Sequence, residues 1–333
     1  MKAIRFLTEN QDIKQLVEQF YKEWQDATDY VITFTSGSTG KPREIKLKKE
    51  FMKASALASG KFFQFQKGQL TRLALSPQTI GGKMLLLRAW LHEMIIEVVE
   101  PSSHPLDNIT TPIDFISLVP YQLEHILKKT PEELCNVRTV LLGGGPISNL
   151  LLERIQQLPC QVYASYGMTE TMSHVALRNL KTAVDFQAIP GVTFSTNENQ
   201  QLTIHAPLIG VNHLETNDVV DLISDTTFIW KGRSDFAINS AGVKIHPEMV
   251  ENALYPYISE RFFIIGEPDE VFGERVVLVI EGRKDDQPIP FEKIVSKYEI
   301  PKQIYYVHHF IETTSGKIDR LSTKNLIDAS KNC

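Results

Sequence analysis

The chain has 333 residues, a net charge of -5, and 42% hydrophobic and 23% charged residues. This length suits two domains, and the composition excludes a disordered or fibrous chain. No long basic stripe is present, which argues against nucleic acid as a partner, and no apolar run approaches the ~20 residues of a membrane helix.

The cysteines, Cys135, Cys160 and Cys333, form no C-x-x-C pair. This arrangement favours neither a disulfide framework nor a zinc ribbon. The first 14 residues lack the apolar segment of a signal peptide. From these features we expect a cytoplasmic protein.

Short apolar strands alternate with helical patterns through the first two-thirds of the chain, which predicts an α/β core with largely parallel strands. The expected strands are residues 31–35, 70–75, 95–99, 115–119, 138–142 and 161–165, and the expected helices are residues 50–57, 82–92, 121–128 and 150–158.

After Pro190 the strands become short and polar-flanked, at 201–205, 219–224 and 228–231, and they predict a small β subdomain. A compact α+β pattern follows. Its strands are expected at 243–245, 262–265, 276–280 and 303–307, and its helices at 247–254, from 291 and from 321. We therefore expect a core of residues 1–234 and a C-terminal domain of residues 235–333.

The segment T-S-G-S-T-G-K-P at 35–42 directly follows a predicted strand. Small residues let the backbone close around phosphate oxygens, and the amides and hydroxyls donate to them. It is not a Walker A loop, because only two residues separate Gly37 from Gly40 and because Pro42 follows the lysine. Eight consecutive residues of this kind disfavour the alternative of a polar surface loop.

The segment Y-G-M-T-E at 166–170 follows the strand predicted at 161–165. An aromatic ring, a hydroxyl and a carboxylate at the carboxyl end of a strand suit a nucleotide site in an open α/β sheet. The alternative is a helix that Thr169 caps.

Both segments resemble the phosphate loop and the Y-G-x-T-E motif of the acyl-adenylate-forming superfamily, which includes acyl- and aryl-CoA synthetases, adenylation domains of peptide synthetases, and luciferase. Other segments resemble further motifs of that superfamily: L-G-G-G-P at 142–146, T-N-D at 216–218 in place of T-G-D, G-R-S-D at 232–235, G-V-K-I-H-P-E at 242–248 and G-K-I-D-R at 316–320. The resemblance therefore extends along most of the chain.

This resemblance implies ATP, Mg²⁺ and coenzyme A as the small molecules used. It implies that the β- and γ-phosphates are bound by Thr35, Ser36, Gly37, Ser38, Thr39, Gly40 and Lys41. Tyr166 would stack on adenine beside Gly143, Gly144 and Gly145, and Gly167 and Met168 belong to the same motif as Tyr166. Thr169 would hold the α-phosphate, Glu170 would bind Mg²⁺, and Asp218 would bind the ribose with help from Arg233.

Lys317 is the implied catalytic lysine, between the substrate carboxylate and the α-phosphate. A carboxylate that attacks a phosphate brings two anions together, and a fixed ammonium with a metal ion offsets the charge that develops. Taken alone, Lys317 reads as an exposed lysine after a turn glycine.

The resemblance also implies that the C-terminal domain is a mobile lid with its hinge at Asp235. One orientation brings the lysine to the site, and the other presents the loop of Gly242 and Lys244 to the CoA thiol. The alternative for Asp235 is an ordinary interdomain turn.

Two features depart from the superfamily pattern. The phosphate loop begins about 35 residues into the chain, whereas most members have a much longer segment before it. We therefore expect that an N-terminal subdomain is missing, and a homodimer is one arrangement that would cover the exposed part of the core. Asn217 replaces glycine in T-G-D, and asparagine tolerates positive φ better than most residues.

Residues 75–90 lie where the superfamily builds its acyl pocket. Gly81 and Gly82 would leave room for a flat or bulky group, and Arg88 inside an apolar helix invites a second carboxylate on the substrate. The alternative is an arginine that snorkels to solvent. Ser173 and His174 follow the Y-G-x-T-E motif and are expected to line the same pocket.

Within the superfamily, this pocket segment, Y-G-M-T-E-T-M-S at 166–173 and the polar stretch at 197–201 most resemble the o-succinylbenzoate–CoA ligases of menaquinone biosynthesis, whose substrate is an aromatic keto-diacid. Another aryl- or acyl-CoA ligase and a carrier-loading adenylation enzyme remain alternatives. An inactive nucleotide-binding relic is a further alternative, which the intact Lys317, Glu170 and Asp218 disfavour.

Overall fold

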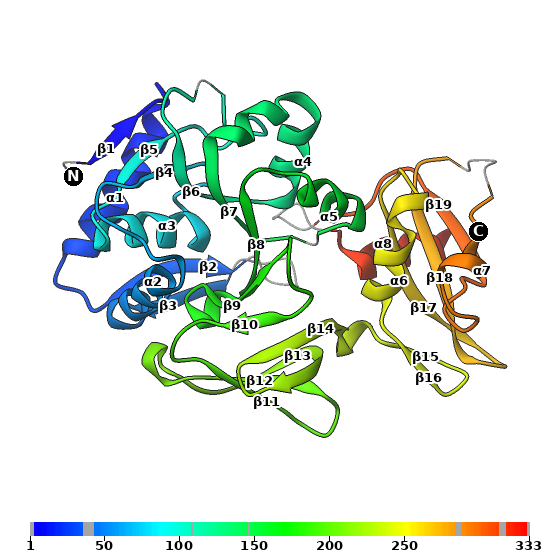
Figure 1. Cartoon of the computed structure of the whole chain (residues 1–333). Helices are drawn as coiled ribbons and strands as arrows, with labels where there is room; N and C mark the ends of the chain where they lie inside the picture. Colours follow the sequence, from blue (N-terminus) through cyan, green and yellow to red (C-terminus); the bar gives the residue numbers. More distant parts are fainter. Residues whose placement is uncertain are drawn as a thin grey trace.

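Two sheets of unequal size organise the computed structural model, which describes residues 3–35, 43–107, 109–145, 147–283, 288–312 and 318–331. The large sheet has twelve strands in the order β1-β5-β4-β6-β7-β8-β9-β10-β14-β13-β12-β11, and the small one has five (Figure 1). A separate hairpin pairs β2 (Tyr30–Thr35) with β3 (Arg43–Lys48). The fold is therefore a mixed α/β fold, as the sequence predicts.

One half of the large sheet is parallel, which confirms the parallel core. Neighbouring strands pair in parallel from β1 to β8. These strands are β1 (Ile4–Phe6), β5 (Ile95–Val98), β4 (Leu70–Leu73), β6 (Ile113–Leu118), β7 (Val137–Leu142) and β8 (Gln161–Gly167).

The other half of the large sheet is antiparallel, and it corrects the prediction of a small separate β subdomain. β9 turns back and pairs antiparallel with β8, and β10 connects β9 to β14, so the later strands continue the core sheet. These strands are β9 (His174–Asn179), β10 (Phe186–Ala188), β11 (Thr193–Thr196), β12 (Gln201–Ala206), β13 (Val211–Ser224) and β14 (Thr227–Arg233).

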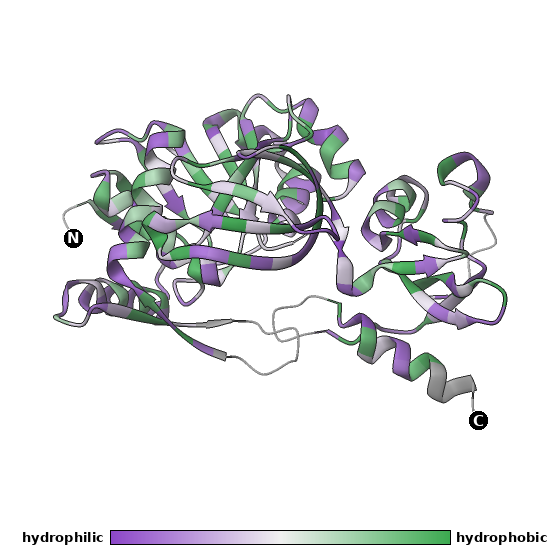
Figure 2. Cartoon of the chain, turned by 90° about the horizontal axis from the view of Figure 1, so that it is seen from below, coloured by the Kyte–Doolittle hydropathy of each residue, from purple (hydrophilic) through white to green (hydrophobic). Residues whose placement is uncertain are grey.

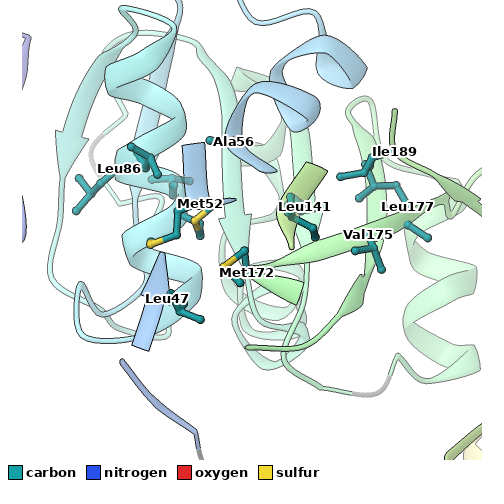
Figure 3. Packing of buried hydrophobic residues seen from close by; sticks show 14 of the residues in the cluster. Leu47, Met52, Ala56, Leu86, Leu141, Met172, Val175, Leu177 and Ile189 are labelled. Atoms are coloured by element: carbon teal, nitrogen blue, oxygen red, sulfur yellow. The ribbon is translucent and has the colours of Figure 1, made fainter. Parts of the chain in front are cut away.

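Helices cover both faces of the parallel half, as the alternation along β7 shows: Leu141 packs in one buried cluster and Leu142 in the other. On the first face lie α2 (Lys49–Phe63) and α3 (Ile80–Leu91), on the second α4 (Pro120–Lys129) and α5 (Asn149–Gln156). Figure 3 shows Met52, Leu86 and Leu141 within the first cluster. The core thus lies on both sides of the strands whose carboxyl ends build the site.

The first helix, α1 (Gln11–Gln25), was not predicted from the sequence. The Asn10 side chain caps it by accepting from the Asp12 amide, and Val17 and Phe20 bury its inner face. Apolar residues three to four positions apart are the helical signal that the sequence offered here.

The small sheet comprises β15 (Ile238–Ser240), β16 (Val243–Ile245), β17 (Phe262–Asp269), β18 (Gly273–Glu281) and β19 (Gln303–Val307). It is antiparallel except where β19 joins β18 in parallel. α6 (Pro247–Leu254) and α7 (Phe291–Ile294) pack on one face, and α8 (Arg320–Lys331) packs on the other. Figure 2 shows both hydrophilic and hydrophobic residues along α8, as expected for a helix with one buried face.

The chain passes from the large sheet to the small one through a short 3-10 turn, Ser234–Phe236. The division at residues 234 and 235 and the hinge at Asp235 stay predictions. None of the helices in the described part of the chain is long and apolar enough to cross a membrane.

Candidate active site

A cavity of ≈ 1040 Å³ opens at the carboxyl ends of β6, β7 and β8. α1, the loop at 75–79 and the start of α3 form other parts of its wall, so two helices, one loop and three strand ends converge there. Carboxyl ends of parallel strands are where open α/β sheets bind their ligands. Of the predicted site residues, Gly81, Arg88, Gly143, Gly144, Gly167, Met168, Thr169, Ser173 and His174 line this cavity.

Arg88 lines the cavity and is only 3% exposed, so the alternative that it snorkels to solvent is wrong. Its Nη2 donates to Ser173 Oγ at 2.8 Å and lies 3.4 Å from His174 Nδ1. The structure therefore brings together three predicted substrate residues, Arg88 from α3 and the other two from the start of β9.

The Arg88 guanidinium has no anionic partner among the described residues, and its Nε is buried without a hydrogen bond. Burial lowers the pKa of Arg88 to about 9, because the apolar surroundings disfavour the charged form. At neutral pH the side chain is still a cation, and a carboxylate placed against it would satisfy its charge.

The two pocket glycines differ in their role. Gly81 lines the cavity, as predicted. Gly82 is not among the lining residues, and a Cβ there would lie 2.2 Å from the Ser76 carbonyl oxygen. Glycine at position 82 thus allows α3 to approach the preceding loop closely, and it does not add volume to the pocket.

The glycine turn after β7 lies at the cavity, which Gly143 and Gly144 line. The Gly143 amide donates to the Leu118 carbonyl at 3.1 Å, and Gly144 adopts a φ of 81° that favours glycine. A Cβ on Gly145 would contact only Pro120, at 3.6 Å. This bare backbone leaves space beside the turn, and its predicted role beside adenine stays a prediction.

Tyr166, Asp218 and Trp230 form a hydrogen-bonded group, and none of the three is among the residues that line the cavity. The Tyr166 hydroxyl donates to Asp218 Oδ2 at 2.7 Å, and the Trp230 indole donates to Oδ1 at 3.0 Å. Burial, and then the neighbouring Asp218 carboxylate, raise the pKa of Tyr166. Asp218 is 8% exposed, so the two donors fix the orientation of a largely buried carboxylate.

Arg233 lies opposite Asp218 in the pairing of β13 with β14, but its guanidinium is engaged elsewhere. Its Nε and Nη2 donate to the two oxygens of Asp235 at 2.9 and 2.7 Å. The predicted ribose residue and the predicted hinge residue therefore form a bidentate ion pair in this structure.

Thr169 and Glu170 begin the short 3-10 turn Thr169–Thr171 after β8. Thr169 lines the cavity, and the Glu170 side chain is exposed. No cluster of three or more metal-binding side chains occurs in the described ranges. Mg²⁺ often uses only one or two carboxylates together with substrate phosphates and water, so a single exposed glutamate is compatible with it.

The AMP-binding enzyme family matches residues 3–205 of this chain. A 2-succinylbenzoate–CoA ligase of Listeria monocytogenes is 28% identical over 348 residues, which cover 93% of this chain and 74% of that protein. The solved AMP-forming acyl-CoA synthetase/AMP-acid ligase II-like protein of Dyadobacter fermentans is 31% identical with a TM-score of 0.65, covering 96% of this chain and 95% of that one.

The chain belongs to the AMP-binding enzyme family. It is a member of the AMP-forming acid–CoA ligases, as the motifs in its sequence predict. The o-succinylbenzoate CoA synthetase of Bacillus subtilis, solved with its acyl-adenylate intermediate, has the same fold, with a TM-score of 0.76 at 22% identity over 88% of this chain and 68% of that one. A second structure of the Bacillus enzyme holds ATP and a magnesium ion.

Several residues that carry family motifs lie outside the described ranges: Ser36, Gly37, Ser38, Thr39, Gly40, Lys41 and Lys317. Thr35 is the last residue of β2, and its pairing with Arg43 holds the two ends of the phosphate loop side by side. Gly242 and Lys244 lie at the β15–β16 hairpin and are absent from the cavity lining. The predicted roles of all these residues stay predictions.

The sequence did not single out α1 and Lys83 as part of the site. Lys83 lies on α3, and its Nζ donates to the Ile32 carbonyl at 2.9 Å and to Glu23 Oε2 at 3.3 Å. Glu23 Oε1 accepts from the Ile32 amide at 3.1 Å. Glu23 of α1 and Lys83 of α3 together thus bind the N–H and the C=O of Ile32 in β2, the strand that leads into the phosphate loop.

Proposed function

We propose that this enzyme activates o-succinylbenzoate as its acyl-adenylate and transfers the acyl group to coenzyme A, a step of menaquinone biosynthesis. The observation that carries this proposal is the buried Arg88 cation, which lines the cavity and has no counter-anion in the described part of the chain. The similarity to 2-succinylbenzoate–CoA ligases of Listeria monocytogenes and Bacillus cytotoxicus, at 28% and 27% identity, supports it.

The residues that line the cavity suit an acid with two carboxylates. Arg88 would bind the ring carboxylate, and the succinyl carboxylate would meet ATP beside Gly143, Gly144 and Thr169, which line the same cavity. Leu75, Ile80 and Leu141 also line the cavity and suit an aromatic ring. A purely apolar acid would leave the buried guanidinium without a partner, at a cost in affinity.

In the proposed reaction, an oxygen of the succinyl carboxylate attacks the α-phosphorus of ATP, and pyrophosphate leaves. The CoA sulfur then attacks the acyl carbon, AMP leaves, and the thiol proton goes to solvent. Thr169 would orient the α-phosphate and Asp218 the ribose. Glu170 would hold Mg²⁺, which supplies positive charge against the phosphates, and Lys317 would bridge the attacking carboxylate and the α-phosphate.

We also propose that residues 235–333 act as a lid that turns about Asp235 between the two half-reactions. The bidentate Arg233–Asp235 pair and the φ of 151° at Gly232 support a joint at this point. Asp235→Pro restricts φ at the joint. We expect it to slow one half-reaction, pyrophosphate release or thioester formation, much more than the other; equal slowing of both would contradict the lid.

The first test is acid-dependent pyrophosphate release from ATP, with and without CoA. The acids are o-succinylbenzoate, benzoate, a medium-chain fatty acid and an amino acid. We expect turnover with o-succinylbenzoate alone, thioester only when CoA is present, and no adenylation by Lys317→Ala. Arg88→Met should raise the KM for o-succinylbenzoate roughly 30-fold or more, since removing one partner of a buried charge pair costs about 2–5 kcal/mol.

If another acid in the panel is preferred, the substrate assignment fails although the ligase chemistry stands. If no acid releases pyrophosphate above the Lys317→Ala background, the chain is an inactive nucleotide-binding relic.

A further inference from the structure

We propose that His174 is a positioning residue, which orients the Arg88 guanidinium toward the cavity through a directional chain of hydrogen bonds ending on α2. The proposal rests on the proposed function, because it assumes that Arg88 receives the second carboxylate of the acid. Under this proposal His174 and Ser59 act through their hydrogen bonds, and not only through packing.

The direction of each hydrogen bond follows from the last acceptor in the chain. The Ser55 carbonyl oxygen can only accept, so the Ser59 hydroxyl, 3.0 Å away, donates its single proton there. The oxygen of Ser59 must then accept from His174 Nε2, which lies 2.9 Å away. Nε2 therefore carries the imidazole proton.

This tautomer determines what the other ring nitrogen can do. With the proton on Nε2, Nδ1 of His174 has a lone pair that accepts from Arg88 Nη2, at 3.4 Å. His174 is 3% exposed and Ser59 is fully buried, so water does not compete for these atoms. Burial and the neighbouring Arg88 cation hold the pKa of His174 well below its usual value, which agrees with a neutral ring.

Because the His174 acceptor is neutral, it holds Arg88 in place without cancelling its positive charge. Nη2 is committed to Ser173 Oγ and His174 Nδ1, whereas Nε and Nη1 donate to no described residue. The guanidinium is thus held at one edge with its remaining donors free. An aspartate or glutamate at position 174 would hold the same edge but would cancel the charge that attracts a carboxylate, whereas a neutral imidazole orients the cation and leaves its charge intact.

The test compares two acids that differ only in the carboxylate that Arg88 would bind: o-succinylbenzoate and 4-oxo-4-phenylbutanoate. The measured quantity is the ratio of their kcat/KM values in pyrophosphate release. We expect His174→Leu to lower kcat/KM for the diacid about tenfold, the usual effect of losing one hydrogen bond to a charged group, and to change the monoacid by less than about twofold. His174→Gln, whose amide oxygen still accepts, should keep most of the preference.

Ser59→Ala and Ser55→Ala form a matched pair on α2. Ser59→Ala frees His174 to take the other tautomer and should weaken the preference for the diacid. Ser55→Ala should leave it unchanged, because the Ser55 hydroxyl is buried without a hydrogen bond and only the backbone oxygen belongs to the chain. Arg88→Leu defines the ratio of kcat/KM values at which the preference for the diacid is completely lost. The double variant that also carries His174→Leu should lower this ratio no further.

The outcomes separate this proposal from the proposed function. If Arg88→Leu removes the preference and His174→Leu keeps it, the positioning role is wrong and the substrate assignment stands. If His174→Leu slows both acids equally, His174 has a packing role only. If Arg88→Leu leaves the preference intact, the proposed function itself fails.

Discussion

The Tyr166 hydroxyl donates a 2.7 Å hydrogen bond to Oδ2 of Asp218 and joins the end of β8 to β13. Removing this donor leaves a largely buried carboxylate with one partner fewer. We expect Tyr166→Phe to lower the free energy of unfolding by roughly 1.5–3 kcal/mol, the range for hydrogen bonds to charged groups, and to raise the KM for ATP. Chemical denaturation and initial rates at varied ATP check this, with Tyr121→Phe as the control because Tyr121 is 64% exposed. Unchanged stability would show that Asp218 finds another donor.

Trp230 binds the other oxygen of the same carboxylate, so it should affect the ribose binding that we propose for Asp218. Trp230→Phe keeps an aromatic ring but removes the indole donor, which lies 3.0 Å from Asp218 Oδ1. We expect the KM for ATP to rise about tenfold and kcat to change little, because one hydrogen bond that orients a binding group is lost. The preference for ATP over 2′-deoxy-ATP should shrink in the same variant.

The control for Trp230→Phe is Trp90→Phe. The Trp90 indole nitrogen is buried without a hydrogen bond, so that substitution removes no donor. If both variants change the KM for ATP equally, the effect of Trp230 lies in packing and not in the orientation of Asp218.

The sequence predicted the parallel core because strand and helix periods alternate clearly from residue 70 to residue 167. It did not predict that the strands after Pro190 continue the same sheet, because the pairing of β10 with β14 joins residues about 40 positions apart and leaves no short-range pattern. Helix α1 was missed although its apolar spacing was readable.

The candidate site likewise contains residues that the sequence predicted and residues that it could not predict. Motifs predicted Thr169 and the glycine turn at the cavity, because each motif binds a ligand through residues that are adjacent in the chain. Ser59 and Lys83 could not be assigned, because their importance comes from contacts across α2, α3, β2 and β9. The residue spacing also suggested that Gly82 gives room to the substrate, whereas the fold uses that space for a backbone oxygen.

The buried neutral His174 makes stability depend on pH in a defined direction. Its folded-state pKa is depressed below the usual 6.5 by burial and by the Arg88 cation, the charged group that faces it. Below pH 6.5 the unfolded chain therefore binds a proton that the folded chain does not, and stability falls as the pH decreases. We expect His174→Gln to remove this contribution to the pH dependence of the unfolding free energy. The measurement is the difference in unfolding free energy between wild type and variant from pH 8 to pH 5. Parallel curves would mean that His174 is protonated in the fold.

Gly167 ends β8 where the chain approaches the start of β9 most closely. A Cβ on Gly167 would lie 2.2 Å from the Ser173 carbonyl oxygen and 2.6 Å from the His174 Cα, so Gly167→Ala must displace the backbone that carries two partners of Arg88. We expect a loss of about 1–3 kcal/mol in unfolding free energy, as for other overpacked sites, together with a weaker preference for the diacid over the monoacid.

Gly145→Ala is the matched control for stability. Its added Cβ would meet only Pro120 side-chain atoms at 3.6 and 3.7 Å, an ordinary contact distance, and Gly145 does not have a positive φ. Its unfolding free energy should stay close to that of the wild type. If Gly167→Ala is equally well tolerated and keeps the preference for the diacid, the β8–β9 turn can shift without moving Ser173 and His174, and the close approach at Gly167 does not determine where Arg88 is held.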